Sequence, residues 1–273
     1  MTVLKKLKKL IRNSTPWRYL NRAGIAFSYF KQPIRRSLGW IPLRTESDNF
    51  YYELTESNIR TLASTISIVT NRPPSLIQTY LEEITNNKNF KSQIRDFFRE
   101  DSNMADSKLG FGRRIGWYAL VRATKPRLVV ETGVHHGIGA SIICEALLRN
   151  NQEGFNGRYL GTDYDSNAGG LVKLNYTSIG TILYGDSIRS LEKIADEVDL
   201  FINDSDHSAV YEGKEYLTIT PKLSERGIII GDNSHVTTEL LDYSLEHSRR
   251  YLFFSEVPEE HWYPGGGIGF SFT

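Results

Sequence analysis

The sequence predicts an α/β fold with a mostly parallel sheet, and three features support this prediction. Beyond Arg127, short apolar segments alternate with helical segments, as in parallel strands joined by crossover helices. The segment 128–133 is an apolar strand that leads into a glycine-rich turn and a helix. Later, 251–257 and 268–272 flank a turn-rich stretch and predict an antiparallel hairpin. We therefore expect seven strands, with helices on both faces of the sheet and a helical extension at the N-terminus.

The remaining elements follow from apolar periodicity. The parallel strands are expected at 128–133, 158–163, 181–185, 198–204 and 227–232. Helices are expected at about 115–124, 139–150, 166–176, 188–197, 208–222 and 237–248. Upstream, the period is helical from Glu46 to about Asp101, with a break at Arg72-Pro73-Pro74. We expect three regions: a basic arm at 1–45, a helical cap at 46–112 and the α/β domain at 113–273.

Composition limits the protein class. The single cysteine, Cys144, cannot form an intrachain disulfide and fits a reducing compartment. No apolar run reaches the length of about 18 residues that a spanning helix requires, and no signal peptide is recognisable. We expect a cytoplasmic protein, with peripheral membrane contact left open by the arm.

The arm is strongly basic. Residues 1–44 contain eleven Lys or Arg and no Asp or Glu, although the whole chain has a net charge of only +1. Residues 1–12 place apolar and basic side chains on opposite faces of a helix. Such an arm fits docking on the acidic remainder of its own chain or of a second subunit in a homo-oligomer, or attachment to an anionic membrane. Nucleic acid is the weakest of these alternatives.

Acidic or amide side chains lie at the carboxyl end of every expected parallel strand. They are Glu131, Asp163, Asp186, Asp204 and the pair Asp232-Asn233. Because the carboxyl ends of parallel strands meet at one edge of the sheet, where open α/β folds bind ligands, we expect a common site there. Helix capping at Asp165 and Ser187 explains some polar residues in this region, but not an acid at all five strand ends.

The turn after the first of these strands contains Gly133, His135, Gly137 and Gly139. Glycine is needed where the chain turns sharply or approaches a ligand closely. The N-terminus of the following helix offers unpaired backbone N–H groups to an anion or a polar ligand. The same spacing also packs a helix on a strand, so the turn alone leaves both interpretations open.

From about Ile115 to Thr273 the sequence resembles class I S-adenosylmethionine-dependent methyltransferases, through Glu131, the glycine turn and the terminal hairpin. The resemblance implies a Rossmann-like fold and S-adenosylmethionine as the methyl donor. It implies these cofactor-binding residues: Glu131, Gly133, His135, Gly137, Gly139, Asp163, Asp186 and Asp204. In these roles Asp163 binds the ribose hydroxyls and Asp186 lies near the adenine amine. Dinucleotide-binding folds share the glycine turn and the second acid, so the later strand ends decide between the two classes.

The residues at the ends of the fourth and fifth expected strands resemble those of the metal-dependent O-methyltransferases that act on catechols, caffeoyl-CoA and macrolide sugars. The family's metal ligands are matched by Asp204 and Asp232-Asn233, and its general base, three residues after the first ligand, by His207. Two carboxylates and an amide oxygen suit Mg²⁺ or another hard divalent cation. An imidazole accepts a proton near neutral pH. The alternative for His207 is a hydrogen-bonded histidine at a helix edge.

The methyl acceptor is expected to be a hydroxylated small molecule. The segment Ser234–Glu239 lacks the tryptophan often found there in the phenolic enzymes, and the basic arm has no counterpart in them. Both departures favour a sugar or another aliphatic hydroxyl over a catechol. Two alternatives remain: a non-catalytic cofactor-binding protein recruited through its arm, and a methyltransferase acting on nucleic acid. An acidic cleft disfavours the latter because it repels phosphate.

Overall fold

A computed structural model describes residues 5, 11–12, 14–44, 50–99 and 109–273 of the chain. The chain divides into two compact units, Met1–Arg44 with Glu260–Pro264, and Thr45–Glu259 with Gly265–Thr273. The amphipathic helix expected over 1–12 lies outside the described residues, apart from Lys5, Ile11 and Arg12, which are helical and exposed. No helix in the described part of the chain is long and apolar enough to cross a membrane.

The first unit contains one long helix, α2 (Thr15–Leu43), with no buried residue. The expected N-terminal helical extension is confirmed, but the sequence pattern assigned a helix only to 1–12 and not to this segment. Pro16 occupies the first turn, where its missing N–H costs nothing. Pro33 and Pro42 lie inside the helix, and the Ser37 hydroxyl donates a hydrogen bond of 2.9 Å to the Pro33 carbonyl.

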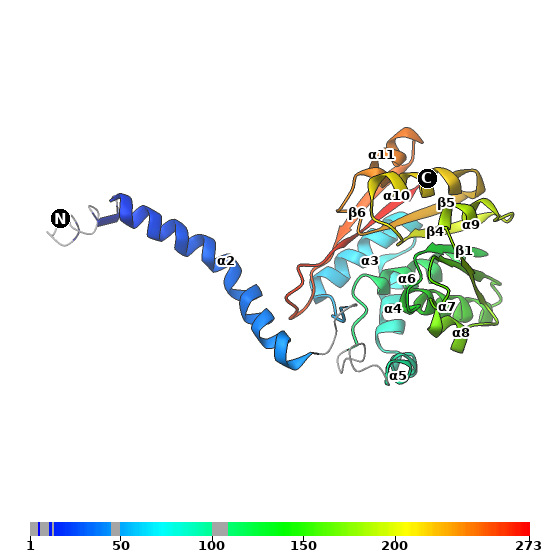
Figure 1. Cartoon of the computed structure of the whole chain (residues 1–273), viewed down its shortest axis with the longest axis horizontal. Coiled ribbons are helices and arrows are strands. Elements are labelled where there is room, and N and C mark those ends of the chain that lie inside the picture. Colours follow the sequence, from blue (N-terminus) through cyan, green and yellow to red (C-terminus); the bar gives the residue numbers. More distant parts are fainter. Residues whose placement is uncertain (1–4, 6–10, 13, 45–49, 100–108) are drawn as a thin grey trace. The chain divides into compact units, whose positions relative to one another are not determined.

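The second unit is built on a seven-stranded sheet in the order β3-β2-β1-β4-β5-β7-β6. Figure 1 labels β1, β4, β5 and β6 of this sheet. The strands are β1 (Leu128–Thr132), β2 (Arg158–Asp163), β3 (Gly180–Tyr184), β4 (Val198–Asn203), β5 (Leu223–Asp232), β6 (Arg250–Ser255) and β7 (Gly267–Phe272). The first five are parallel, and β7 is antiparallel to both β5 and β6. The predicted fold class, including the antiparallel C-terminal hairpin, is confirmed.

Helices cover both faces of this sheet. They are α6 (Arg114–Thr124), α7 (Ile138–Gln152), α8 (Gly170–Asn175), α9 (Ser187–Glu192), α10 (Ala209–Ile219), the 3₁₀ turn η1 (Thr220–Lys222) and α11 (Glu239–Glu246). On one face α9, α10 and α11 bury Leu191, Tyr216 and Leu240 against Val130 and Phe201 of the sheet. On the other face α6 packs on α7, and α7 packs on β2. This sandwich fixes the strand ends that form the site.

Two predicted helices are shorter than expected. We expected a helix from 166, but α8 begins only at Gly170. The Asp165 carboxylate accepts the Asn167 N–H at 2.9 Å, and Gly169 has φ +75°, so a turn replaces the first helical residues. The helix expected over 188–197 ends at Glu192 in α9.

The helices before the sheet follow their predicted breaks. They are α3 (Glu56–Thr70), α4 (Pro74–Thr85) and α5 (Lys88–Phe97), and α4 begins at the predicted Pro73-Pro74 break. Residues 50–55 differ from the helical expectation. Leu54 forms an antiparallel bridge with Pro258, and Tyr51, Tyr52 and Leu54 are buried. Burial of these side chains requires an extended chain here rather than a helix.

Candidate active site

A cavity of about 680 Å³ lies at the carboxyl ends of β1 to β4, within the range typical of small-molecule sites. Its lining includes most of the predicted cofactor residues: Glu131, Gly133, His135, Gly139, Asp163, Asp186 and Asp204. Gly137 is not among the lining residues. It has φ +90° at the N-cap of α7, so it serves the turn rather than the cavity wall.

The glycine turn is held by the carboxylate of Asp163. Its Oδ2 accepts the backbone N–H groups of Val134 at 2.9 Å and His135 at 2.8 Å. Its Oδ1 accepts the N–H of Asp165 at 2.8 Å. The carboxylate therefore ties the end of β2 to the turn after β1. This loop-anchoring role was not foreseen from the sequence, which assigned Asp163 to ribose alone.

Replacing Asp163 by alanine is expected to weaken S-adenosylhomocysteine binding by about 10- to 100-fold, because it removes a charge-assisted contact of about 1.5–3 kcal/mol. Calorimetric titration measures the affinity. The control is Asp165→Ala. The Asp165 carboxylate lies two residues further along the chain and accepts only the backbone and side-chain N–H groups of Asn167. Wild-type affinity in a folded Asp163→Ala protein would refute the assignment of Asp163 to cofactor binding.

Close backbone packing explains Gly133. This residue has φ +83°, and a Cβ built on it would lie 2.0 Å from the carbonyl oxygen of Asp204. The turn after β1 thus touches the turn after β4, which brings the predicted cofactor and metal residues together. A valine here would disturb the fold as well as the ligand site.

Glu131 is a buried carboxylate in the cavity wall, and it accepts a hydrogen bond from the Tyr159 hydroxyl. Gly139 makes room for it, since a Cβ there would lie 2.5 Å from the Trp117 ring and 3.0 Å from Glu131 Oε1. Burial raises the pKa of Glu131 to about 8, although the Tyr159 hydrogen bond opposes the shift. Burial thus favours the protonated form of this carboxyl.

This burial predicts a dependence of stability on pH. Between the ordinary value of 4.5 and the folded value of about 8, the folded protein holds a proton that the unfolded chain has released. Stability therefore falls as pH rises through this window, by up to about 1.4 kcal/mol per unit. Glu131→Gln is expected to flatten the slope. Urea unfolding between about pH 5.5 and pH 8 measures it, with the exposed Glu225→Gln as control. A Glu131→Gln slope equal to the wild-type slope would contradict the shift.

Glu215 of α10 is a second buried carboxylate, and we did not predict it as a site residue. It accepts hydrogen bonds from four polar side chains that follow or end the strands: Thr132, Ser187, Asn203 and Ser205. Burial raises its pKa, and its hydroxyl partners oppose this rise. The sequence did contain a signal for Glu215, because this acid lies on the apolar side of the helix predicted over 208–222.

Asp186 lies near Glu215 and caps α9. Its carboxylate accepts the Arg189 N–H at 3.0 Å and the Tyr211 hydroxyl at 3.1 Å.

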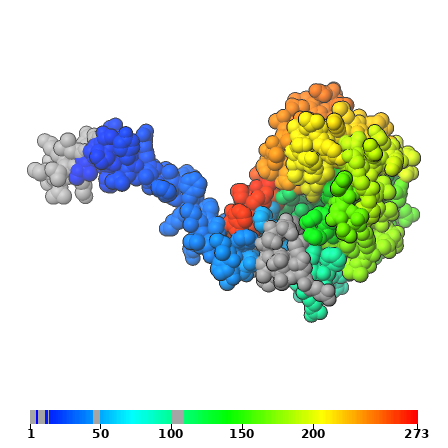
Figure 2. All heavy atoms as spheres, in the orientation of Figure 1, coloured from blue at the N-terminus to red at the C-terminus, as the bar shows by residue number. Residues whose placement is uncertain are grey.

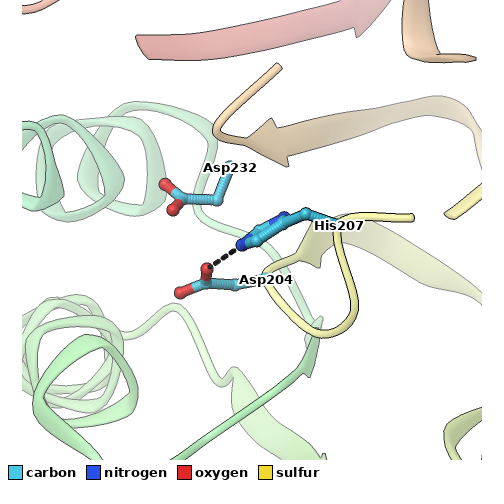
Figure 3. Close-up of side chains that lie close together, drawn as sticks. All are labelled: Asp204, His207 and Asp232. Carbon is cyan, nitrogen blue, oxygen red and sulfur yellow. Dashed lines mark ion pairs between the residues drawn. The ribbon is translucent and has the colours of Figure 1, made fainter. Parts of the chain in front are cut away.

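The structure brings Asp204, His207 and Asp232 together beside this cavity (Figure 3). One ligand atom from each residue lies within 4.8 Å of the others. His207 Nε2 lies 3.8 Å from Asp204 Oδ1 and 3.2 Å from Asn233 Nδ2. Burial and the charge of Asp232 raise the pKa of Asp204 well above its ordinary value. Two carboxylates in such proximity, one buried and one partly buried, require a positive partner or a shared proton.

Arg113, just before α6, supplies a positive charge that the sequence analysis missed. Its guanidinium donates to both oxygens of Asp232, at 2.5 Å for Nε to Oδ1, and Nη2 also donates to Asn233 Oδ1 at 3.1 Å. Nη1 donates to Glu256 Oε2 at 2.9 Å. Burial disfavours the Asp232 charge, yet Arg113 holds the pKa of Asp232 below its usual value. No strand-end pattern marks Arg113, because its partners are distant in the sequence.

The oxygen and nitrogen atoms of this cluster are chemically suited to a hard divalent cation, provided that the cation shares Asp232 with Arg113. Asp204 and Asp232 offer carboxylate oxygens, Asn233 an amide oxygen and His207 a ring nitrogen. Arg113 already engages both Asp232 oxygens, but a carboxylate has about four lone-pair sites. A cation here would therefore share Asp232 with the guanidinium.

Comparisons with known proteins agree with this fold. Residues 130–234 match the family model described as a methyltransferase domain. An O-methyltransferase from Bacillus cereus, solved with S-adenosylhomocysteine, is 14% identical with a TM-score of 0.54, covering 71% of this chain and 96% of that one. The O-methyltransferase TomG from Streptomyces achromogenes, solved with S-adenosylmethionine, is 12% identical with a TM-score of 0.50, covering 67% of this chain and 89% of that one. No curated protein matches the chain.

Residues 130–234 thus match a methyltransferase domain, and the solved structures share the predicted fold of the sheet and its helices. The roles of individual site residues, the metal and the acceptor stay predictions.

Proposed function

We propose that the protein transfers the methyl group of S-adenosylmethionine to a hydroxyl of a small molecule, a sugar or another aliphatic alcohol, with help from a divalent cation. One observation carries the proposal. Asp204 lines the cofactor cavity and also belongs to the cluster with His207 and Asp232, so the methyl donor and the acceptor hydroxyl would meet at this residue.

The side chains supply a base and its electrostatic support. His207 Nε2 faces Asp204 and is the nitrogen that would take the acceptor's proton. Asp204 at 3.8 Å would then stabilise the imidazolium. Asn233 Nδ2, at 3.2 Å from Nε2, orients the ring until the acceptor hydroxyl replaces it. Asp204, Asp232 and Asn233 would hold Mg²⁺ or a related cation, which would favour the alkoxide form of the acceptor.

Positioning is the other contribution expected of the site. The methyl carbon must lie in line between the sulfonium and the attacking oxygen, and holding both reactants in this geometry lowers the barrier substantially. The hydrogen bonds of Asp163 and Glu215 tie the segments of the cavity wall together, which serves this positioning. The contact between Gly133 and the Asp204 backbone fixes the distance between the two halves of the site.

Arg113 supports a metal-free variant of the same function. Its guanidinium bridges Asp232 and Asn233, two of the three predicted ligands, and could act as the site's permanent cation. His207 would then work as a base without metal. A non-catalytic cofactor-binding role remains the alternative from another class, whereas nothing in the site favours a nucleic-acid acceptor.

The experiment is a turnover screen with S-adenosylmethionine on sugar and phenol acceptors, in Mg²⁺ and after exhaustive chelation, together with binding of Mn²⁺ followed by paramagnetic resonance. Sugar methylation that chelation abolishes, with stoichiometric Mn²⁺ binding, is the expected result. Turnover that survives chelation without Mn²⁺ binding would assign the cationic role to Arg113. Cofactor binding without turnover on any acceptor would favour the non-catalytic alternative.

A further inference from the structure

Helix α2 exposes a continuous apolar stripe over its whole length. The stripe side chains recur at spacings of three and four residues and therefore share one helical face: Leu20, Ala23, Phe27, Phe30, Ile34, Leu38 and Ile41. The large ones are 54% to 70% exposed, and the helix has no buried residue. Figure 2 shows the side chains of this helix in blue. Such a stripe is far larger than scattered surface apolar residues and marks a binding face.

Outside the stripe, the helix surface contains basic residues and no acid, together with separate apolar side chains such as Ile25 and Tyr29. The charged residues of α2 lie outside the stripe: Arg18, Arg22, Lys31, Arg35 and Arg36. An apolar face flanked by Lys and Arg is the pattern of helices that lie in the plane of a membrane interface. Anionic headgroups complement the basic residues, and acyl chains accept the apolar side chains.

A second copy of α2 fits this surface less well. Leu20, Phe27 and Ile34 are seven residues apart, a spacing that coiled coils also use. A homodimer along this stripe would bring together two helices that each carry five positive charges and no acid to pair with them. Nucleic acid would satisfy the charges but would leave the aromatic and aliphatic stripe in water.

We propose that α2 binds the surface of anionic lipid bilayers, with the stripe from Leu20 to Ile41 inserted among the acyl chains and the basic residues at the headgroups. The proposal is independent of the methyl acceptor. Residues 1–12, whose sequence pattern predicts a helix of the same kind, would extend the contact, but the argument rests on α2.

Vesicle flotation of the full chain tests the proposal, comparing phosphatidylcholine vesicles with vesicles that also contain phosphatidylglycerol. Phe27→Ser/Ile34→Ser removes two stripe side chains that are 70% and 54% exposed. The matched control, Ile25→Ser/Tyr29→Ser, removes an aliphatic and an aromatic side chain that are 55% and 78% exposed on the opposite side. Arg18→Gln/Arg22→Gln removes two charges. Binding of S-adenosylhomocysteine verifies that every variant is folded.

The wild type is expected to float only with the anionic vesicles. The stripe variant should bind at least about tenfold more weakly, because each inserted large side chain contributes more than a factor of ten when fully buried. The charge variant should lose about fivefold per residue, and less at high salt. The control should bind like the wild type.

Three outcomes would overturn the proposal. One is equal flotation of the stripe variant and its control. Another is a wild-type dimer in sedimentation that the stripe variant dissociates, with no vesicle binding, which would assign the stripe to a second copy. The third is salt-dependent binding to duplex DNA or RNA that the stripe variant retains, with no vesicle binding.

Discussion

Replacing Arg113 by methionine is expected to lower the free energy of unfolding by about 3–5 kcal/mol, because the substitution leaves buried carboxylates without their partner. Asp232 and Glu256 are both fully buried, and the side chain of Arg113 is only 9% exposed. Methionine keeps much of the volume, so the lost charge dominates over the lost packing. Urea unfolding followed by circular dichroism measures the change.

The control for this substitution is Arg60→Met. Arg60 pairs with Glu56 four residues earlier on α3, with both side chains largely exposed, so its loss is expected to change stability by less than about 0.5 kcal/mol. Adding Asp232→Asn and Glu256→Gln to Arg113→Met should recover part of the stability. A loss below about 1 kcal/mol in Arg113→Met would contradict the buried network.

Asp204→Asn should reduce methyl transfer by about a thousandfold while the protein stays folded and binds cofactor nearly as the wild type does. The amide keeps the shape of the side chain but removes the charge that would hold a cation and stabilise protonated His207. The backbone contacts are unchanged, because Asp204 N–H donates to Thr132 O at 2.9 Å and its carbonyl adjoins Gly133. Initial rates and calorimetry of the same preparation measure the two effects separately.

The control is Asp242→Asn on the distant helix α11, where the carboxylate accepts only the exposed Thr238 hydroxyl. It should retain wild-type turnover. Full activity of Asp204→Asn would remove this residue from the mechanism. We prefer Asp204 to Asp232 for this test, since loss of the Asp232 charge also leaves Arg113 buried without its main partner.

The sequence predicted the sheet and the cavity edge well, because both depend on local patterns. Strand ends are marked by a change from apolar to acidic residues, and parallel topology then brings Glu131, Asp163 and Asp204 to one edge. The extent of α2 within the expected N-terminal helical extension could not be predicted in the same way. Proline usually ends a helix, and no local rule indicates that the chain continues as a helix through Pro33.

Arg113 and Glu215 show a second limit of sequence reasoning. Each is a charged residue in a helical region, where charge normally indicates an exposed face. Their burial depends on partners that lie between about 10 and 140 residues away in the chain, such as Ser205 for Glu215 and Glu256 for Arg113. Pairings over such distances become visible only when the fold is known.

Glu256 and β7, both near the C-terminal end of the described residues, complete the sheet and the partners of Arg113. Glu256 accepts hydrogen bonds from Tyr52, Arg113 and the N–H of Gly266, and β7 inserts between β5 and β6. A nascent chain that has not yet emerged beyond residue 272 lacks the strand that flanks β5 on this side, and before residue 256 it also lacks one partner of Arg113. A chain that lacks β7 therefore exposes the edge of β5 to pairing with other incomplete chains.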